Sequence, residues 1–194
     1  MRLNNEGLKD RKSWENAGYS LPEYDRETVT KATRENPFWI HFGAGNIFRA
    51  FQANVVQDLL NQGVLDRGLV VAEGYDYEII QKMNHPHDDY SILVTLKANG
   101  TVEKTIVGSV VESLALDSDN AEQFQRLKEI FSADSLQMAS FTIKDIISMV
   151  QMVSLLPWSL QIWLLVLRLP SVILEKYHLY YMQDFLQEKS RLPW

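Results

Sequence analysis

Short apolar runs alternate with longer stretches in which apolar side chains recur every three or four positions between residues 37 and 143. The short runs are typical of buried strands, and the longer stretches are typical of helices with one apolar face. The pattern predicts, in chain order, strands at 38–42, 69–72 and 136–143, a hairpin of 91–96 with 102–107, and helices at 47–62, 77–83 and 120–131. Strands that alternate with helices indicate an α/β fold with a parallel sheet.

Local motifs support this division of the chain. Asn99-Gly100 lies between two β-rich runs, an arrangement that strongly indicates a tight hairpin. The polar cluster at 117–120 supplies N-cap side chains for the helix that follows. The first 36 residues are polar and rich in turn-forming residues, so we expect an N-terminal arm over 1–36 that lies on the domain.

The composition is that of an ordinary globular protein, with 194 residues of which 46% are hydrophobic and 23% are charged. A net charge of -6 argues against a nucleic-acid partner, because phosphate backbones require a surplus of Lys and Arg. The absence of Cys excludes disulfides, thiolate zinc sites and Cys nucleophiles. The first residues lack the apolar run of a signal peptide, and we therefore expect a cytoplasmic protein.

The charge is distributed unevenly along the chain. Residues 1–145 carry 22 acidic and 15 basic side chains, whereas residues 146–194 carry 3 and 4. The segment 146–167 has no charged residue, and its 22 residues are long enough to span a bilayer. Its Gln, Ser and Pro residues weaken that interpretation. A pair of amphipathic helices is disfavoured too, because the apolar residues form no sustained one-sided stripe.

A candidate binding turn, Gly43-Ala44-Gly45, lies directly between a predicted strand and a predicted helix. A first glycine permits a tight turn, and a second lets the backbone approach a pyrophosphate that the amides at the helix start then hold. Phe48 stands where the usual dinucleotide fingerprint has a third glycine, so a plain strand-to-helix turn is the alternative. Arg49 is placed either to reach a phosphate or to extend into solvent.

Two acidic residues follow the second predicted strand, where a dinucleotide-binding domain places the carboxylate that hydrogen-bonds the ribose. They are Glu73 and Asp76, at a somewhat longer spacing from Gly45 than is usual. A carboxylate at this point repels a 2′-phosphate, so the sequence favours NAD over NADP. Either side chain is alternatively an ordinary helix N-cap.

The segment 85–89 (HPHDD) contains side chains that bind metals, but two His separated by Pro rarely converge on one ion. We interpret it as a solvated loop and predict no metal site. The sequence also contains no Ser-His-Asp arrangement or Gly-x-Ser-x-Gly motif, so we assign no catalytic nucleophile.

Several segments resemble the mannitol dehydrogenase family, the polyol-specific long-chain dehydrogenases that include fructuronate and tagaturonate reductases. They are 39–53 (WIHFGAGNIFRAFQA), 70–78 (VVAEGYDYE), 86–89 (PHDD) and 140–143 (SFTI). The resemblance covers about residues 3 to 143, and the family's turn also has a bulky residue at the position of Phe48. It implies a Rossmann-like, doubly wound parallel sheet with an inserted β-hairpin over 37–143. It also implies metal-independent hydride transfer between NAD(H) and a polyol or sugar acid.

The resemblance also implies how NAD would be bound. The pyrophosphate would contact the turn and the helix start, with Gly45 behind it and the amide of Asn46 bonded to a phosphate. Asp76 or Glu73 would hold the ribose, and the nicotinamide would lie towards Thr142. The residues expected to contact the pyrophosphate are Gly43, Ala44, Gly45, Asn46, Ile47, Phe48 and Arg49.

The resemblance ends at residue 143, and we treat 144–194 as an aberrant tail. The family's second domain supplies a catalytic Lys with Asn and His partners, and no position here matches them. Back-translation of 144–153 and 174–183 in a shifted frame permits strings typical of the family, so we hypothesise a frameshifted tail. We expect a truncated NAD-binding domain that is inactive alone. The alternative is a membrane-anchored or non-catalytic binding protein that uses 146–167.

Overall fold

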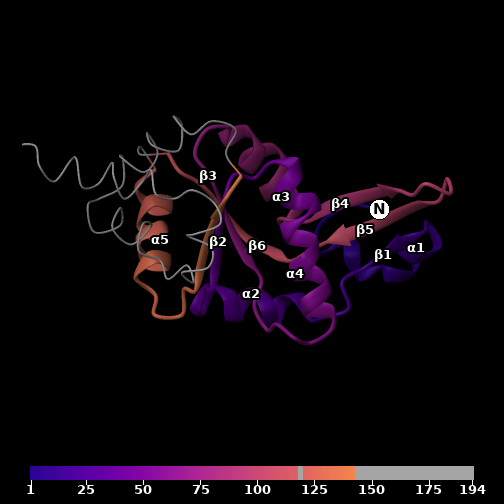
Figure 1. The fold of residues 1–194 in the computed structure, drawn as a ribbon, viewed down its shortest axis with the longest axis horizontal. Helices are drawn as coiled ribbons and strands as arrows, with labels where there is room; N and C mark the ends of the chain where they lie inside the picture. The colour runs from indigo at the N-terminus through magenta and orange to yellow at the C-terminus, as the bar shows by residue number, and fades with distance from the viewer. Residues whose placement is uncertain (118–119, 143–194) are drawn as a thin grey trace, which may run out of the picture.

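The computed structural model describes residues 1–117 and 120–142 (Figure 1). The predictions for the tail, including the uncharged segment 146–167 and the shifted reading frame, lie outside the described residues. Among the helices that are described, none combines the length and apolar character needed to cross a membrane.

A four-stranded parallel sheet forms the centre of the domain. Its strands are β2 (Trp39–Phe42), β3 (Leu69–Glu73), β6 (Val110–Ala115) and β7 (Met138–Phe141). Their order in space is β6-β3-β2-β7, and every neighbouring pair is parallel. Numbered along the chain, this order is third, second, first, fourth, as in a Rossmann sheet. The predicted Rossmann-like sheet is therefore confirmed.

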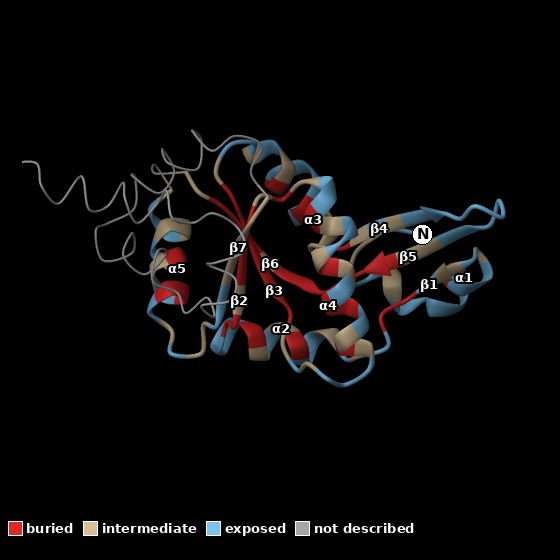
Figure 2. Cartoon of the chain, viewed as in Figure 1, coloured by how far each residue is buried: buried red, intermediate tan, exposed pale blue. Residues whose placement is uncertain are grey.

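Helices cover both faces of this sheet (Figure 1). One face carries α2 (Arg26–Glu35), α3 (Asn46–Ala50) and α4 (Gln52–Asn61), and the other carries α5 (Ala121–Ser132). In β3, Leu69 and Val71 pack towards the first face, whereas Val70 and Ala72 pack towards α5. All residues of β3 are buried, as expected for a parallel strand enclosed between two helical layers (Figure 2).

A second, smaller sheet extends away from the domain (Figure 1). It consists of β1 (Tyr19–Ser20), β5 (Val102–Val107) and β4 (Ser91–Leu96), in the order β1-β5-β4. β4 and β5 are antiparallel, with Leu96 opposite Val102, and Gly100 between them has a φ of 83°. The predicted hairpin is confirmed. β1 pairs with β5 in parallel and so joins the N-terminal arm to this sheet.

Short helices lie in the arm and in the segment before β4. These are η1 (Gly7–Lys9), α1 (Arg11–Asn16), η2 (Ile79–Asn84) and η3 (His85–His87), the last two from the segment before β4. Arg26 donates hydrogen bonds to the carbonyls of Gly108 and Val110, each at 3.0 Å. α2, which the sequence places in the arm, contributes Val29 to the main core. The second half of the arm therefore forms part of the layer that covers the sheet.

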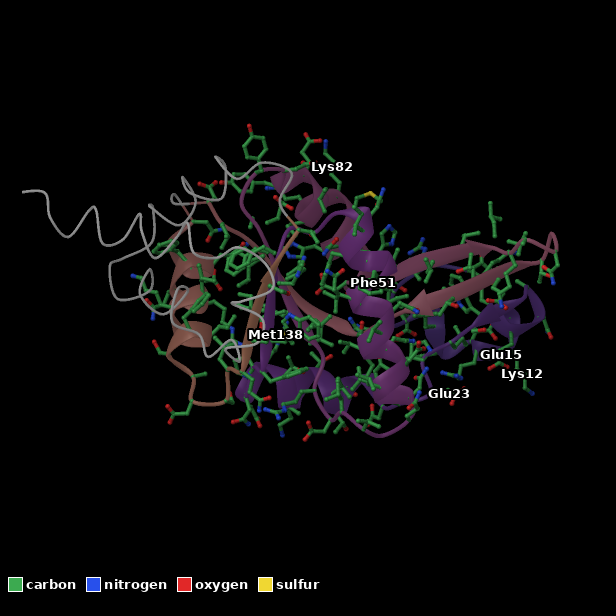
Figure 3. All side chains as sticks on the ribbon, in the orientation of Figure 1. Lys12, Glu15, Glu23, Phe51, Lys82 and Met138 are labelled. Atoms are coloured by element: carbon green, nitrogen blue, oxygen red, sulfur yellow. The ribbon has the colours of Figure 1, made fainter. Side chains whose placement is uncertain are left out.

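The prediction of one continuous helix over 47–62 is wrong. The segment forms α3 and α4, which meet at Phe51 (Figure 3). Phe48 and Val56 are fully buried, whereas Ile47 and Phe51 are 72% and 64% exposed. Both sides of the segment are apolar, so the sequence pattern does not identify the side that packs on the sheet.

The sequence pattern also does not predict β6. Glu112 and Ser113 interrupt its apolar run, and both are satisfied by partners from other elements. Arg126 of α5 donates from Nε to Glu112 at 2.8 Å, and the Ser113 hydroxyl donates to Asp89 at 2.5 Å. These partners are brought close only by the tertiary fold, which is why the local pattern fails here.

Candidate functional site

The glycine turn follows β2 at the carboxyl edge of the sheet, between β3 and β7. The chain reaches β3 from β2 through helices on one face of the sheet, and it reaches β7 from β6 through α5 on the opposite face. The glycine turn therefore lies at the topological switch point, where α/β sheets bind ligands. Gly43 has a φ of 107°, and its amide donates to the carbonyl of Ala72 at 2.8 Å. A Cβ atom at Gly43 would lie 2.6 Å from the Thr142 carbonyl oxygen. Both the conformation and the close approach of β7 therefore require glycine at this position.

Gly45 differs from Gly43 in what it requires. Its φ of -71° and ψ of 175° describe an extended conformation that any residue adopts. A Cβ atom at Gly45 would meet no atom of residues 1–117 and 120–142 within 4 Å, apart from its neighbours in the chain. Neither the backbone nor the packing of the described chain explains glycine here, so the space beside Gly45 is open to a group from outside.

The two candidate acidic residues have different environments. Glu73 is the last residue of β3 and is 8% exposed. Its Oε2 accepts the Ala44 amide at 2.8 Å, and its Oε1 accepts the Tyr75 and Asp76 amides at 2.9 and 3.3 Å. The side chain of Asp76 is exposed to solvent. Glu73 is therefore engaged by the backbone, whereas Asp76 is accessible.

Arg49 lies on α3, one turn after Asn46, and its Nη2 donates to the Asn46 side-chain oxygen at 2.8 Å. Its Nε is buried and has no hydrogen-bond partner among the described residues, and burial lowers the pKa of the guanidinium. Both side chains line a cavity of about 390 Å³ between α3 and the start of β4. Arg49 is thus partly buried beside Asn46.

A polar network between β2 and β7 was not identified from the sequence. The two ring nitrogens of His41 lie 2.7 Å from the Ser140 hydroxyl and 2.8 Å from the Thr142 hydroxyl. The His41 ring is fully buried and stacks on Phe48, with 4.1 Å between the ring centroids. Burial lowers the pKa of His41 to about 4, so the ring is neutral at neutral pH. The available indications of this network were the lone His41 in the apolar run of β2 and the alternating Ser140 and Thr142 at the end of β7.

The segment 85–89 forms η3 and the turn after it. Nε2 of His85 lies 3.2 Å from the Ser113 carbonyl, and Nδ1 of His87 lies 3.0 Å from the Leu3 carbonyl. Over residues 1–117 and 120–142, no group of three or more His, Asp or Glu side chains converges as a metal site would require.

The order of the sheet and the glycine turn at its switch point define a Rossmann-type fold. No protein-family model matches the chain. The chain is 49% identical over 145 residues to D-mannonate oxidoreductase of Thermotoga maritima. The matched residues make up 75% of this chain and 27% of that protein. This likeness, together with the fold, supports the mannitol dehydrogenase family, and the chain matches its N-terminal part.

Two solved structures share the fold. A D-sorbitol dehydrogenase in substrate-free form superposes with a TM-score of 0.59 at 20% identity. A Pseudomonas fluorescens mannitol 2-dehydrogenase, in a ternary complex with NAD and D-mannitol, gives the same TM-score at 22% identity. Each likeness covers 74% of this chain and 27% of the other. The chain thus spans about a quarter of the length of these relatives.

Proposed function

We propose that the domain over 37–143 binds NAD and is the cofactor-binding part of a dehydrogenase acting on a polyol or sugar acid. Gly45 carries this proposal, because the open space beside it lies at the switch point and has no structural explanation within the described chain. The family supports the same chemistry, since its named relatives oxidise or reduce mannonate, sorbitol and mannitol. When bound, NAD supplies the acceptor for the hydride.

The residues around the turn fit a dinucleotide. The pyrophosphate lies against Gly45 and receives hydrogen bonds from backbone amides at the start of α3, including that of Asn46. Arg49 adds positive charge beside Asn46. Thr142 directly follows β7 and lies next to Gly43, so the nicotinamide half would extend towards the end of β7. The full set is the one expected from the sequence, Gly43, Ala44, Gly45, Asn46, Ile47, Phe48, Arg49 and Thr142, together with an acidic residue.

Asp76 is the acidic residue that we propose for the ribose. Its carboxylate is exposed after β3, where a dinucleotide-binding fold places the adenosine ribose. Both oxygens of Glu73 already accept backbone amides. A negative charge at Asp76 attracts the ribose hydroxyls and repels a 2′-phosphate, so NAD is preferred over NADP.

The described part of the chain supports binding without turnover. His41 is the titratable side chain that lies closest to the turn along β2, but both its ring nitrogens are engaged by hydroxyls. Its pKa of about 4 also removes it as an acid at neutral pH. We therefore propose that catalysis in this family depends on residues outside 1–142.

The discrimination between NAD and NADP tests this function. The whole chain is titrated with each nucleotide by calorimetry, as wild type, Asp76→Asn and the control Asp58→Asn, an exposed carboxylate on α4. We expect tighter binding of NAD, and a loss of about tenfold in the NAD/NADP ratio for Asp76→Asn only. Equal affinities in the wild type, or an unchanged ratio in Asp76→Asn, would contradict the assignment.

A further inference from the structure

Glu73 occupies the junction of three segments at the carboxyl edge of the sheet. Its Oε2 accepts the Ala44 amide of the glycine turn at 2.8 Å. Its Oε1 accepts the amides of Tyr75 and Asp76 in the loop after β3. Its own carbonyl accepts the Leu116 amide after β6 at 2.8 Å. One residue therefore connects the loops that follow β2, β3 and β6.

The buried Ala44 amide depends on Glu73 for its hydrogen bond. Ala44 is fully buried, so its amide has no access to water if Glu73 is lost. None of the ion pairs formed by residues 1–117 and 120–142 includes Glu73, and its negative charge is therefore compensated by backbone dipoles. A buried donor left without an acceptor is unfavourable, and hydrogen bonds to a charged acceptor are stronger than neutral ones.

A carboxylate suits this junction better than its closest analogue. The two oxygens of Glu73 accept on opposite sides, one from the glycine turn and one from the loop that carries Asp76. A Gln side chain has one oxygen and one NH₂ group, so it presents a donor to one of the two segments. Glu73→Gln therefore removes the hydrogen bond to one of the two segments. It places the NH₂ group of Gln against a backbone amide, so that two donors face each other, with little change in side-chain volume.

We propose that Glu73 is a positioning residue that fixes the glycine turn to the Asp76 loop, so that both halves of the adenosine diphosphate site are held in register before ligand binds. It acts through the backbone of Ala44 and does not contact the ribose. The proposal rests on the proposed function for its effect on NAD affinity, but the attachment itself is a property of the free protein.

Hydrogen exchange of the whole chain without ligand tests the attachment directly. We expect the Ala44 amide to exchange about as slowly as the amides of β2, although it lies in a turn. In Glu73→Gln, exchange over 43–46 and 74–76 should rise at least about tenfold while exchange in α5 stays unchanged. Fast exchange of the Ala44 amide in the wild type would overturn the proposal. This measurement uses the wild type alone, so it does not depend on whether Glu73→Gln folds.

Nucleotide binding separates positioning from direct contact. Glu73→Gln should weaken binding of both NAD and NADP, by about tenfold, and any change in their affinity ratio should occur only together with faster exchange over 74–76. Glu73→Asp keeps the charge with a shorter side chain and should recover part of that affinity. The control Glu78→Gln alters an exposed carboxylate paired with Lys82 at 2.8 Å and should change neither exchange nor affinity.

The outcomes distinguish this proposal from the proposed function. A changed NAD/NADP ratio in Glu73→Gln with unchanged exchange would make Glu73 a ribose ligand and overturn the positioning role. Absence of NAD binding by a wild type whose Ala44 amide is protected would instead reject the function and retain the attachment.

Discussion

The two sheets of this molecule differ in how they are enclosed. The central sheet has helices on both faces, and every residue of β3 is buried. In β4 of the small sheet, alternate side chains reach solvent, and Val94 and Leu96 are 52% and 77% exposed. The enclosed sheet carries the glycine turn at its edge, whereas the small sheet connects the arm to the domain. The difference shows where substitutions should affect stability and where they should affect binding.

The largest contrast is expected from apolar truncation in each sheet. Phe42 is 1% exposed in β2 and stacks on Phe141, with 4.9 Å between centroids. Phe42→Ala should lower the free energy of unfolding by about 3–5 kcal/mol, because it leaves a cavity between β2 and α5. Val94→Ala in the exposed row of β4 should cost about 0.5 kcal/mol or less. Urea denaturation measures both, and equal losses would refute the contrast.

The next contrast is in the pH dependence of stability. The pKa of His41 is about 4 in the folded protein and about 6.5 when unfolded, so the unfolded state binds the proton more tightly. The stabilisation is complete above pH 6.5 and is lost as the pH falls towards 4, by up to about 3 kcal/mol. His41→Gln should remove this slope from denaturation curves measured between pH 4 and 7.

A matched control completes this test. Gln81 is exposed and carries no titratable group, and Gln81→Ala should keep the wild-type slope. Burial raises the pKa of Asp89, which acts in the opposite direction, but this contribution cancels in the difference between wild type and variant. A slope that survives in His41→Gln would show that another group causes it.

The smallest contrast concerns two glycines with positive φ. A Cβ atom at Gly43 meets the Thr142 carbonyl oxygen at 2.6 Å, whereas one at Gly100 in the hairpin meets no other described residue within 4 Å, its sequence neighbours aside. Gly100→Ala should therefore cost about 1 kcal/mol for its conformation alone, and Gly43→Ala should cost at least about 2 kcal/mol. Thermal unfolding compares them, and a smaller loss in Gly43→Ala would be inconsistent with the tight contact to β7.

Features that local chemistry determines were predictable from the sequence. The hairpin follows from Asn99-Gly100, and Gly100 has the positive φ that this turn requires. Asn120 caps α5 by accepting the Gln123 amide at 3.1 Å, as the polar cluster before that helix predicts. The glycine turn was placed correctly between β2 and the following helix, because its neighbours in sequence are also its neighbours in structure.

Features that depend on distant partners were not predictable. Glu73 and Asp76 are equivalent candidates in the sequence, and only the fold shows that Ala44, 29 residues earlier, donates to Glu73. The sequence pattern does not predict β6 because Glu112 interrupts its apolar run, and the partner of Glu112, Arg126, lies on α5. Phe48 and Phe51 are both large apolar residues in the sequence, and only the fold shows that Phe48 is buried and Phe51 is exposed. Tertiary contacts decide between local alternatives in each case.

NAD binding at Gly45 is the central claim, and calorimetric titration of the wild type and Gly45→Ala with NAD tests it most directly. The added Cβ atom meets no atom of the described part of the chain within 4 Å apart from its sequence neighbours, so the variant should unfold at the wild-type temperature without ligand. We predict that the wild type binds NAD and that Gly45→Ala binds it at least about tenfold more weakly. The reason is that the added methyl group would fill the space beside Gly45 that the pyrophosphate would occupy. No binding to a folded wild type, or equal affinity in the variant, would contradict the account.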